Sequence, residues 1–365
     1  MLLRFLFFLF LKQFLFSEQI DKPIRALWVV RDHLTLKKSI DEVLLFANKN
    51  GFNHIFVQVR GRGDAYYNSN IVPKSHLVSA DFDPLDYLLK SNNDKSIKVH
   101  AWINIYYLWS SKTFPDQRNH LLFEKPEWID RSKNESYIKE QIYLRNKTQL
   151  KIDGEGFYLA PTNPMVNKYL ISVIDELIRN YKLDGIHYDY IRFHNSNYGH
   201  NENGLSEFSL KSFNNYNSNE DVLFSEFKRN SITKFVRDAS KNIKSNSSDI
   251  IISAAVKPNI YNAKLLFFQE WDLWLSAGYL DWAVPMNYMA DNEDFVQNMY
   301  IIRDNLPSKY HDKVVVGVST YNQNARSAGK KIERLKKMNF NNISIFSYTE
   351  FAKNPYYWKK IKKYF

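Results

Sequence analysis

The sequence has 365 residues and contains no cysteine. The protein therefore forms no disulfide bonds, uses no cysteine nucleophile and builds no thiolate metal site. The absence of cysteine leaves export from the cytoplasm open. It does exclude the attachment of a lipid to a cysteine behind the apolar N-terminal run.

Several common ligand motifs are also missing from the sequence. There is no His-Glu-x-x-His helix, so the usual zinc signature is absent. The turn Arg60–Gly63 follows a predicted strand but lacks the spacing and the lysine of a nucleotide-binding loop. No basic segment is interleaved with aromatic residues in the manner of a nucleic-acid groove. We therefore expect no cofactor, no metal and no nucleic-acid partner.

The N-terminus begins with a run of leucine and phenylalanine. Residues 1–16 are interrupted by Arg4, Lys12 and Gln13, which makes the run too short and too broken for a comfortable membrane span. Its basic start and Ser17 predict that residues 1–17 are a signal peptide; the alternative is an uncleaved N-terminal anchor. We expect an exported protein, periplasmic or extracellular, that contacts the inner membrane only if this segment is retained.

The net charge of +11 suggests an anionic partner, such as a charged polysaccharide, a membrane surface or nucleic acid. The abundance of lysine and asparagine along the whole chain also fits a compositional bias with no such partner. A length of 365 residues and a hydrophobic share of 44% are enough for one large core or two smaller ones.

Residues 22–365 alternate between strand patterns and helix patterns. Eight strand-then-helix units predict the α/β class and a single (β/α)8 TIM barrel. The long connections at residues 108–163 and 194–221 follow strands 3 and 4, which puts them on the face where barrels bind substrate. The predicted strands cover residues 25–31, 53–60, 97–107, 183–193, 250–257, 281–288, 313–319 and 342–348.

The fourth predicted strand carries the leading catalytic candidate. Alternation puts His187 and Asp189 on one face of this strand. A carboxylate at the carboxyl end of a parallel strand lies where α/β enzymes keep their chemistry, so Asp189 is the candidate. The alternative is that Asp189 forms a buried ion pair with Arg60 or Arg192.

Aromatic and polar side chains near the other strand ends form the candidate substrate-binding set. Flat rings there can stack on sugars, although Trp28 and Trp102 fit the barrel core equally well. Alternation also places Arg60 on the same face as Phe56 and Gln58. The candidates from the strand ends are Trp102, Tyr106, Arg192, Asn287 and Tyr288.

The order of several blocks resembles the glycosyl hydrolase-like family 10, a group of mostly exported bacterial (β/α)8 proteins. These blocks are Arg25–Trp28, Gly51–Arg60, Asp64–Tyr67, Asp83–Leu85, His100–Asn104, Pro126–Trp128 and Asp184–Tyr190.

The resemblance implies hydrolysis of glycosidic bonds in a polysaccharide, and characterised relatives act on peptidoglycan glycan strands. It also implies that Asp189 is the catalytic-site carboxylate, with Arg60, His100, Asn104 and His187 lining the same cavity. Many relatives have a second Asp directly after this position, where Tyr190 stands here.

Glycoside hydrolysis usually needs a second carboxyl group. The candidates are Asp64 after the second strand, Asp291 after the sixth, Glu350 after the eighth, and a carboxylate of the long loops such as Glu155. Glu350 also suits the first turn of a helix, where acids are stabilising. We expect Arg60 and His187 to lower the pKa of Asp189, which would suit a nucleophile.

The sequence is also compatible with two other functions. A non-catalytic carbohydrate-binding barrel would keep the aromatic residues and Arg60 without needing paired carboxylates. A metal-dependent polysaccharide deacetylase would need Asp32 and His33 to converge with His100 and His187 in three dimensions.

Overall fold

The computed structural model describes residues 22–92, 95–133, 149–152, 154–212 and 219–365. The predicted leader, residues 1–17, lies outside this part of the chain. The main sheet contains eight parallel strands in the order β8-β7-β6-β3-β2-β1-β10-β9. These strands are β1 (Arg25–Val29), β2 (His54–Arg60), β3 (Lys98–Asn104), β6 (Gly185–Asp189), β7 (Ile251–Val256), β8 (Trp282–Pro285), β9 (Val316–Ser319) and β10 (Ile343–Phe346).

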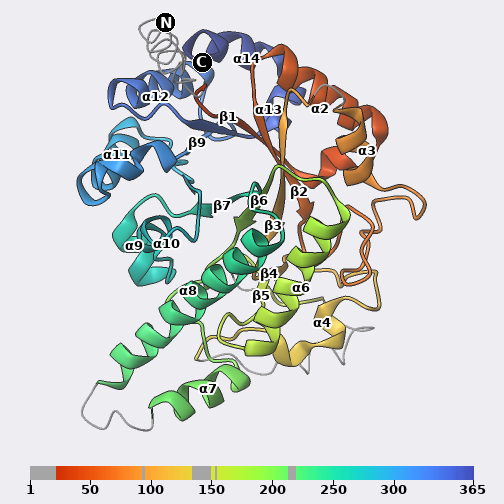
Figure 1. Cartoon of the computed structure of the whole chain (residues 1–365), viewed down its shortest axis with the longest axis vertical. Helices are drawn as coiled ribbons and strands as arrows, with labels where there is room; N and C mark the ends of the chain where they lie inside the picture. Colours follow the sequence, from red (N-terminus) through yellow and green to blue (C-terminus); the bar gives the residue numbers. More distant parts are fainter. Residues whose placement is uncertain (1–21, 93–94, 134–148, 153, 213–218) are drawn as a thin grey trace, which may run out of the picture.

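The two outer strands of this sheet approach each other and nearly close it. Parallel bridges join Ala283 to Val314 and Met286 to Gly317, so β8 reaches β9. Helices follow the strands and surround the sheet, as Figure 1 shows. The predicted (β/α)8 barrel is therefore confirmed.

The helices that follow the strands are α2 (Lys37–Lys49), α3 (Pro84–Ser91), α6 (Pro164–Asn180), α8 (Glu220–Asn246), α10 (Trp271–Ser276), α11 (Asn292–Asn305), α12 (Ala325–Lys337) and α14 (Pro355–Ile361). Further helices that the sequence did not predict are α4 (Leu121–Glu124), α7 (Glu202–Ser212), α9 (Ile260–Leu266) and α13 (Tyr348–Lys353). No helix in the described part of the chain combines the length and the apolar character that a membrane crossing requires.

Helix α6 illustrates why the helices form where the pattern predicts them. The side chain of Asn163 accepts a hydrogen bond from the Met165 amide at 3.0 Å, and Pro164 occupies the first helical position. Both features favour a helix start. The apolar residues recur at helical spacing and are buried, which fixes α6 against the sheet. They include Val166, Leu170, Val173, Ile174 and Leu177.

Aromatic side chains fill the middle of the barrel. The ring of Trp28 lies 5.0 Å from Phe56, 4.8 Å from Trp102 and 4.6 Å from His187. The Trp28 indole donates a hydrogen bond to Ser344 at 3.1 Å. Edge-to-face packing of this kind adds to the free energy of burial. Trp28 and Trp102 are thus part of the barrel core.

A second layer lies at the amino-terminal end of the barrel. His54 and His100 are joined by a 2.9 Å hydrogen bond, and the His100 ring packs 5.3 Å from that of Trp282. A Cβ atom on Gly185 would lie only 2.0 Å from Nδ1 of His100. The first residue of β6 must therefore be glycine for the imidazole to fit.

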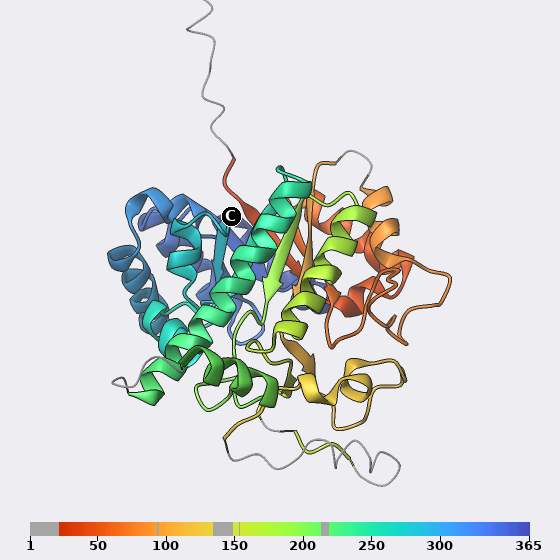
Figure 2. The same ribbon diagram turned by 60° about the horizontal axis from the view of Figure 1, so that its bottom comes forward.

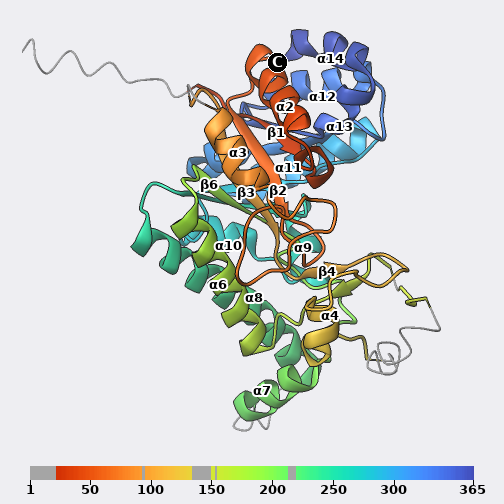
Figure 3. The ribbon, with the colours of Figure 1, turned by 90° about the vertical axis from the view of Figure 1, so that its right-hand side faces the viewer.

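The described parts of the two long connections gather at the carboxyl ends of β3 and β6. They contain α4, α7 and a two-stranded hairpin of β4 (Tyr107–Trp109) and β5 (Phe157–Tyr158). Figures 2 and 3 show α4 and α7 at one end of the molecule, away from α12 and α14. This is the end at which Asn104 and Asp189 finish their strands.

We predict that Gly185→Ala lowers the free energy of unfolding by about 1–3 kcal/mol, because the new methyl group overlaps His100. Urea unfolding of the single variants and of Gly185→Ala with His100→Ala tests this prediction. In the His100→Ala background the methyl group has room, so its added effect should fall below about 1 kcal/mol. Equal effects in both backgrounds would contradict the packing described here.

Candidate active site

Asp189 ends strand β6 with its carboxyl group buried and hydrogen-bonded. Oδ2 accepts from the Trp102 indole at 3.2 Å, and Oδ1 accepts from the Tyr190 amide at 2.7 Å. Tyr190 has a φ of 50°, a left-handed conformation that is uncommon outside glycine. This local turn follows the strand directly, where its amide can reach the carboxylate.

Burial raises the pKa of Asp189 to about 6, although the Tyr190 amide, the charge of Arg192 and the Trp102 indole favour the ionised form. The expectation that Arg60 and His187 lower this pKa is wrong. Burial lowers the pKa of His187 to about 3, so its imidazole is neutral, and Nδ1 bonds to Ser253 at 2.8 Å. Burial in the barrel is the dominant influence on Asp189.

Glu155 is the carboxylate that the long loop after β3 brings toward Asp189. It forms an ion pair with Arg192 at 2.6 Å and accepts a hydrogen bond from Tyr158 at 2.5 Å. Burial opposes ionisation of Glu155, but the charge of Arg192 and these hydrogen bonds bring its pKa below the ordinary value. The negative charge of Glu155 also contributes to the raised pKa of Asp189.

Arg192 pairs with Glu155 instead of Asp189. Its guanidinium group donates to the carbonyl oxygens of Phe193 and His194 at 3.2 and 3.3 Å. It also lies 4.9 Å from the Tyr190 ring centroid. Within the described residues, no ion pair shorter than 4.0 Å involves Asp189. The site thus holds two carboxyl groups whose pKa values are shifted in opposite directions, a feature of acid–base pairs in enzymes.

The structure places Arg60 away from the face predicted by alternation. The register of β2 shifts between Gln58 and Arg60, which breaks the two-residue period. The Arg60 guanidinium donates to the carbonyl oxygen of Asn104. Burial raises the pKa values of Tyr67 and Tyr169, and the nearby charge of Arg60 opposes that rise. Arg60 therefore lies between the end of β3 and α6.

Three of the predicted substrate-binding residues lie near Asp189. Asn104 is its register partner in β3, and the Trp102 indole donates to the Asn104 side chain at 3.0 Å as well as to Asp189. The ring of Tyr288 is 5.3 Å from Phe346, and the charge of Asp189 contributes to the raised pKa of Tyr288, behind the larger effect of burial. Trp102, Asn104 and Tyr288 are therefore neighbours of the candidate carboxyl group.

The remaining predicted substrate-binding residues lie deeper in the fold. His187 stacks on Phe56 at 4.2 Å in the middle of the barrel, and His100 belongs to the amino-terminal layer. The Tyr106 hydroxyl donates to Asn167 of α6 at 2.9 Å, and the Asn287 side chain donates to the Phe295 carbonyl at 2.9 Å. These contacts connect strands and helices and leave the groups buried.

The three carboxylates predicted as partners of Asp189 have local structural contacts. Asp64 is buried and accepts from the Arg62 amide at 2.9 Å. Asp291 caps α11 by accepting from the amides of Glu293 and Asp294 at 2.7 and 3.1 Å. Glu350 lies in the first turn of α13, 3.8 Å from Lys353.

The histidines considered for a metal site have separate partners. His33 bonds to Thr349 at 3.0 Å, while His100 bonds to His54 and His187 to Ser253. In the part of the chain that the structure describes, no three His, Cys, Asp or Glu side chains gather as a metal site would require.

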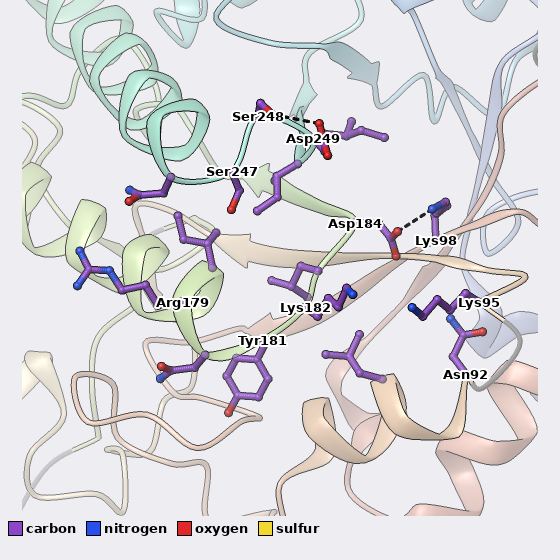
Figure 4. A pocket seen from close by; sticks show the side chains of 17 residues that line it. Asn92, Lys95, Lys98, Arg179, Tyr181, Lys182, Asp184, Ser247, Ser248 and Asp249 are labelled. Carbon is purple, nitrogen blue, oxygen red and sulfur yellow. Dashed lines mark hydrogen bonds and ion pairs between the residues drawn. The ribbon is translucent and has the colours of Figure 1, made fainter.

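A cavity of about 880 Å³ opens at the opposite end of the barrel. Figure 4 shows its lining residues, among them Lys98 and Asp184, whose side chains form an ion pair at 2.9 Å. These residues lie at the amino-terminal ends of β3 and β6. Since barrel enzymes react at the carboxyl ends of their strands, this cavity is remote from the candidate chemistry.

Comparison with known proteins identifies the family. A model of the glycosyl hydrolase-like 10 family matches residues 23–331, most of the chain. The chain belongs to the glycosyl hydrolase-like 10 family. This membership confirms the resemblance found in the sequence and supports a glycosidase-related role.

Curated relatives of the chain include two proteins named as glycosyl hydrolases. The chain is 27% identical over 202 residues to glycosyl hydrolase DigH of Escherichia coli (strain K12), covering 47% of this chain and 43% of DigH. It is 22% identical over 196 residues to glycosyl hydrolase YngK of Bacillus subtilis (strain 168), covering 48% of this chain and 34% of YngK. The matches thus span less than half the length of these relatives.

Solved glycoside hydrolases share the fold. The glycoside hydrolase domain of PgaB (BpsB) from Bordetella bronchiseptica superposes with a TM-score of 0.70 at 10% identity, covering 93% of this chain and 98% of that domain. Alpha-L-fucosidase isoenzyme 2 from Paenibacillus thiaminolyticus gives a TM-score of 0.63 at 14% identity, covering 94% of this chain and 49% of that protein. At these identities the similarity concerns the fold alone.

We predict that Trp102→Phe raises the pKa of Asp189 further above about 6, by roughly one pH unit, because a donor to the ionised carboxyl group is lost. A ¹³C NMR titration of the aspartate carboxyl carbons measures this. Trp28→Phe is the matched control, since that indole donates to Ser344. A change of the same size in the pKa of Asp189 in both variants would contradict the role given to Trp102.

Proposed function

We propose that this protein is a glycoside hydrolase that cleaves glycosidic bonds in a bacterial polysaccharide with a pair of carboxyl groups. The observation that carries the proposal is the placement of two carboxyl groups at the carboxyl end of the barrel, Asp189 at the end of β6 and Glu155 on the loop that meets Arg192. Burial raises the pKa of Asp189 to about 6, while Arg192 and Tyr158 bring that of Glu155 below its ordinary value. Around pH 5 to 6 such a pair contains one protonated and one ionised carboxyl group, as this chemistry needs.

In the proposed reaction Asp189 is the general acid. Its proton passes to the glycosidic oxygen while the bond from that oxygen to the anomeric carbon breaks. The Tyr190 amide and the Trp102 indole then stabilise the aspartate that remains. Glu155 supplies the second carboxylate, which attacks the anomeric carbon or takes the proton of the attacking water.

The surroundings of Asp189 suit a sugar. The Tyr288 hydroxyl is buried and has no hydrogen-bond partner within the described residues. Leaving such a hydroxyl unpaired is unfavourable, and a sugar hydroxyl would satisfy it. The rings of Tyr107 and Tyr190 stack at 4.4 Å beside the site and add flat apolar surface.

Peptidoglycan glycan strands are the proposed substrate. The resemblance implies them, and the leader predicted at residues 1–17 would carry the protein to the compartment that contains this polymer. The net charge of +11 also favours an acidic polymer over a neutral one.

We predict that Asp189→Asn lowers kcat by about 10²–10⁴-fold, because the amide cannot donate the proton of a general acid. Mass spectrometry of the products from purified glycan strands measures the cleavage, and wild-type activity should fall as pH rises above about 6. Asp189→Asn with near-normal activity would rule out this role.

Glu155→Gln tests the second carboxylate in the same assay, beside Asp64→Asn, Asp291→Asn and Glu350→Gln. If one of these three variants lost as much activity as Asp189→Asn while Glu155→Gln stayed active, that residue would be the second carboxylate and Glu155 would not. If wild type binds the glycan and releases no product, a non-catalytic carbohydrate-binding barrel becomes the better interpretation.

A further inference from the structure

Lys257 lies at the carboxyl end of β7, directly above the level of Asp189. On the interior face of β7, Ser253 bonds to His187 and Ala255 belongs to the cluster around Trp28. Strand alternation makes Lys257 the next residue on this face. The register pairs Tyr188 with Ala254, so Asp189 is level with Ala255. Lys257 then stands one pleat repeat, about 7 Å, farther toward the open end of the barrel.

The backbone of Lys257 is held in place by two side chains. Its amide donates to Gln269 at 3.0 Å, and its carbonyl oxygen accepts from the Trp271 indole at 3.1 Å. Gln269 and Trp271 are themselves buried. The start of the lysine side chain is therefore fixed at the edge of the site.

The ammonium group lies within the charged cluster of the site. It is 4.4 Å from the ring centroid of Phe267, and the Arg192 guanidinium is 5.1 Å from the same ring. Burial and Arg192 lower the pKa of Lys257 to about 8, while Glu155 and Asp189 oppose that change. All four ionisable groups therefore act on one another.

Within the described residues the two cations of this cluster differ in their polar contacts, because the guanidinium group of Arg192 is bound and the ammonium group of Lys257 is not. The terminal nitrogens of Arg192 are bound to Glu155 and to backbone carbonyl oxygens. Among the described residues the Lys257 ammonium has no hydrogen bond or ion pair, and it lies over the Phe267 ring. When Asp189 is protonated, Arg192 and Lys257 contribute two positive charges and Glu155 one negative charge, which leaves an excess of one positive charge.

We propose that Lys257 binds an anionic substituent, such as a carboxylate, on a sugar at the cleavage site. The proposal rests on the proposed function and adds that the substrate is an acidic glycan. A half-buried ammonium group with three unused donors gains most from an anion, because a charge-assisted hydrogen bond is stronger than one to a neutral group. Lys257 is a specificity-determining residue in this account.

Isothermal titration calorimetry with matched ligands tests the proposal. The probes are a peptidoglycan glycan oligosaccharide with free carboxylates and the same oligosaccharide with these groups methyl-esterified. We expect Lys257→Gln to weaken binding of the acid about tenfold or more and that of the ester by less than about twofold. Lys257→Arg should retain the preference for the acid, since it keeps the positive charge.

Lys182→Gln is the control for a general loss of positive charge, because Lys182 is exposed at the other end of the barrel. Its binding of both probes should match wild type. Equal weakening of both probes by Lys257→Gln, unchanged binding, or no preference for the acid in wild type would each overturn the proposal. Thermal unfolding of the variants verifies that they are folded.

All calorimetric titrations use the Asp189→Asn background, in which the proposed cleavage is blocked, so the heats measure binding alone and wild type there means Asp189→Asn with Lys257 and Lys182 intact. If this background prefers the acid through Lys257 but the unaltered protein releases no product, the proposed function fails while the assignment of Lys257 stands. A pH–rate profile tests whether Lys257 acts instead by changing the pKa of Asp189. If Lys257→Gln shifts the alkaline limb of the profile equally with the acid and the ester as substrate, Lys257 acts on the general acid and the proposal is wrong.

Discussion

The candidate site depends on the burial of the Asp189 carboxyl group above a filled barrel. Trp28, Phe56, Trp102 and His187 occupy the interior below it, with ring centroids 4.2–5.0 Å apart in the pairs that touch. This packing separates the carboxyl group from water on one side, and a charge in such surroundings is unfavourable. The pKa of Asp189 rises for this reason even though two hydrogen-bond donors and a nearby arginine oppose it.

The loops surround Glu155 with groups that lower its pKa, whereas the barrel raises the pKa of Asp189. This residue precedes β5 on the connection after β3, and it meets Arg192 from the connection after β6. The ion pair and the Tyr158 hydroxyl favour ionised Glu155. Two carboxyl groups of similar intrinsic acidity thus differ because one belongs to the barrel and the other to its loops. Lys257 adds a second positive charge beside Arg192 at the same site.

Much of the fold follows from sequence periodicity. The strands show alternation or short apolar runs, and α6 shows helical spacing, so the eight units and the position of Asp189 were predictable. Helix α9 was missed because it shares the connection between β7 and β8 with α10, and the strand-then-helix rhythm predicts one helix for each connection. The hairpin β4–β5 was missed because its strands are three and two residues long and far apart in sequence.

The site was harder to predict than the fold. Arg60 was misplaced because the register shift after Gln58 leaves no mark in the alternation pattern. Asn287 and Tyr106 follow strand ends in sequence, yet their side chains bond to α11 and α6. Glu155 was one of several loop carboxylates, and only its contact with Arg192 distinguishes it. Lys257 ends a predicted strand on the face of Ser253, a signal that alternation could have revealed.

The pH dependence of stability tests the burial of Asp189 most directly. Urea unfolding of wild type and Asp189→Asn between pH 4 and 7.5 gives the difference in their free energies of unfolding. A folded-state pKa of about 6 against an unfolded value of 3.8 means that the native state binds the proton more tightly. Wild type should therefore lose about 2 kcal/mol relative to the variant as pH rises from about 4 to 6, and roughly 0.4 kcal/mol more by pH 7.5. A constant difference, or a gain by wild type over that range, would contradict this account.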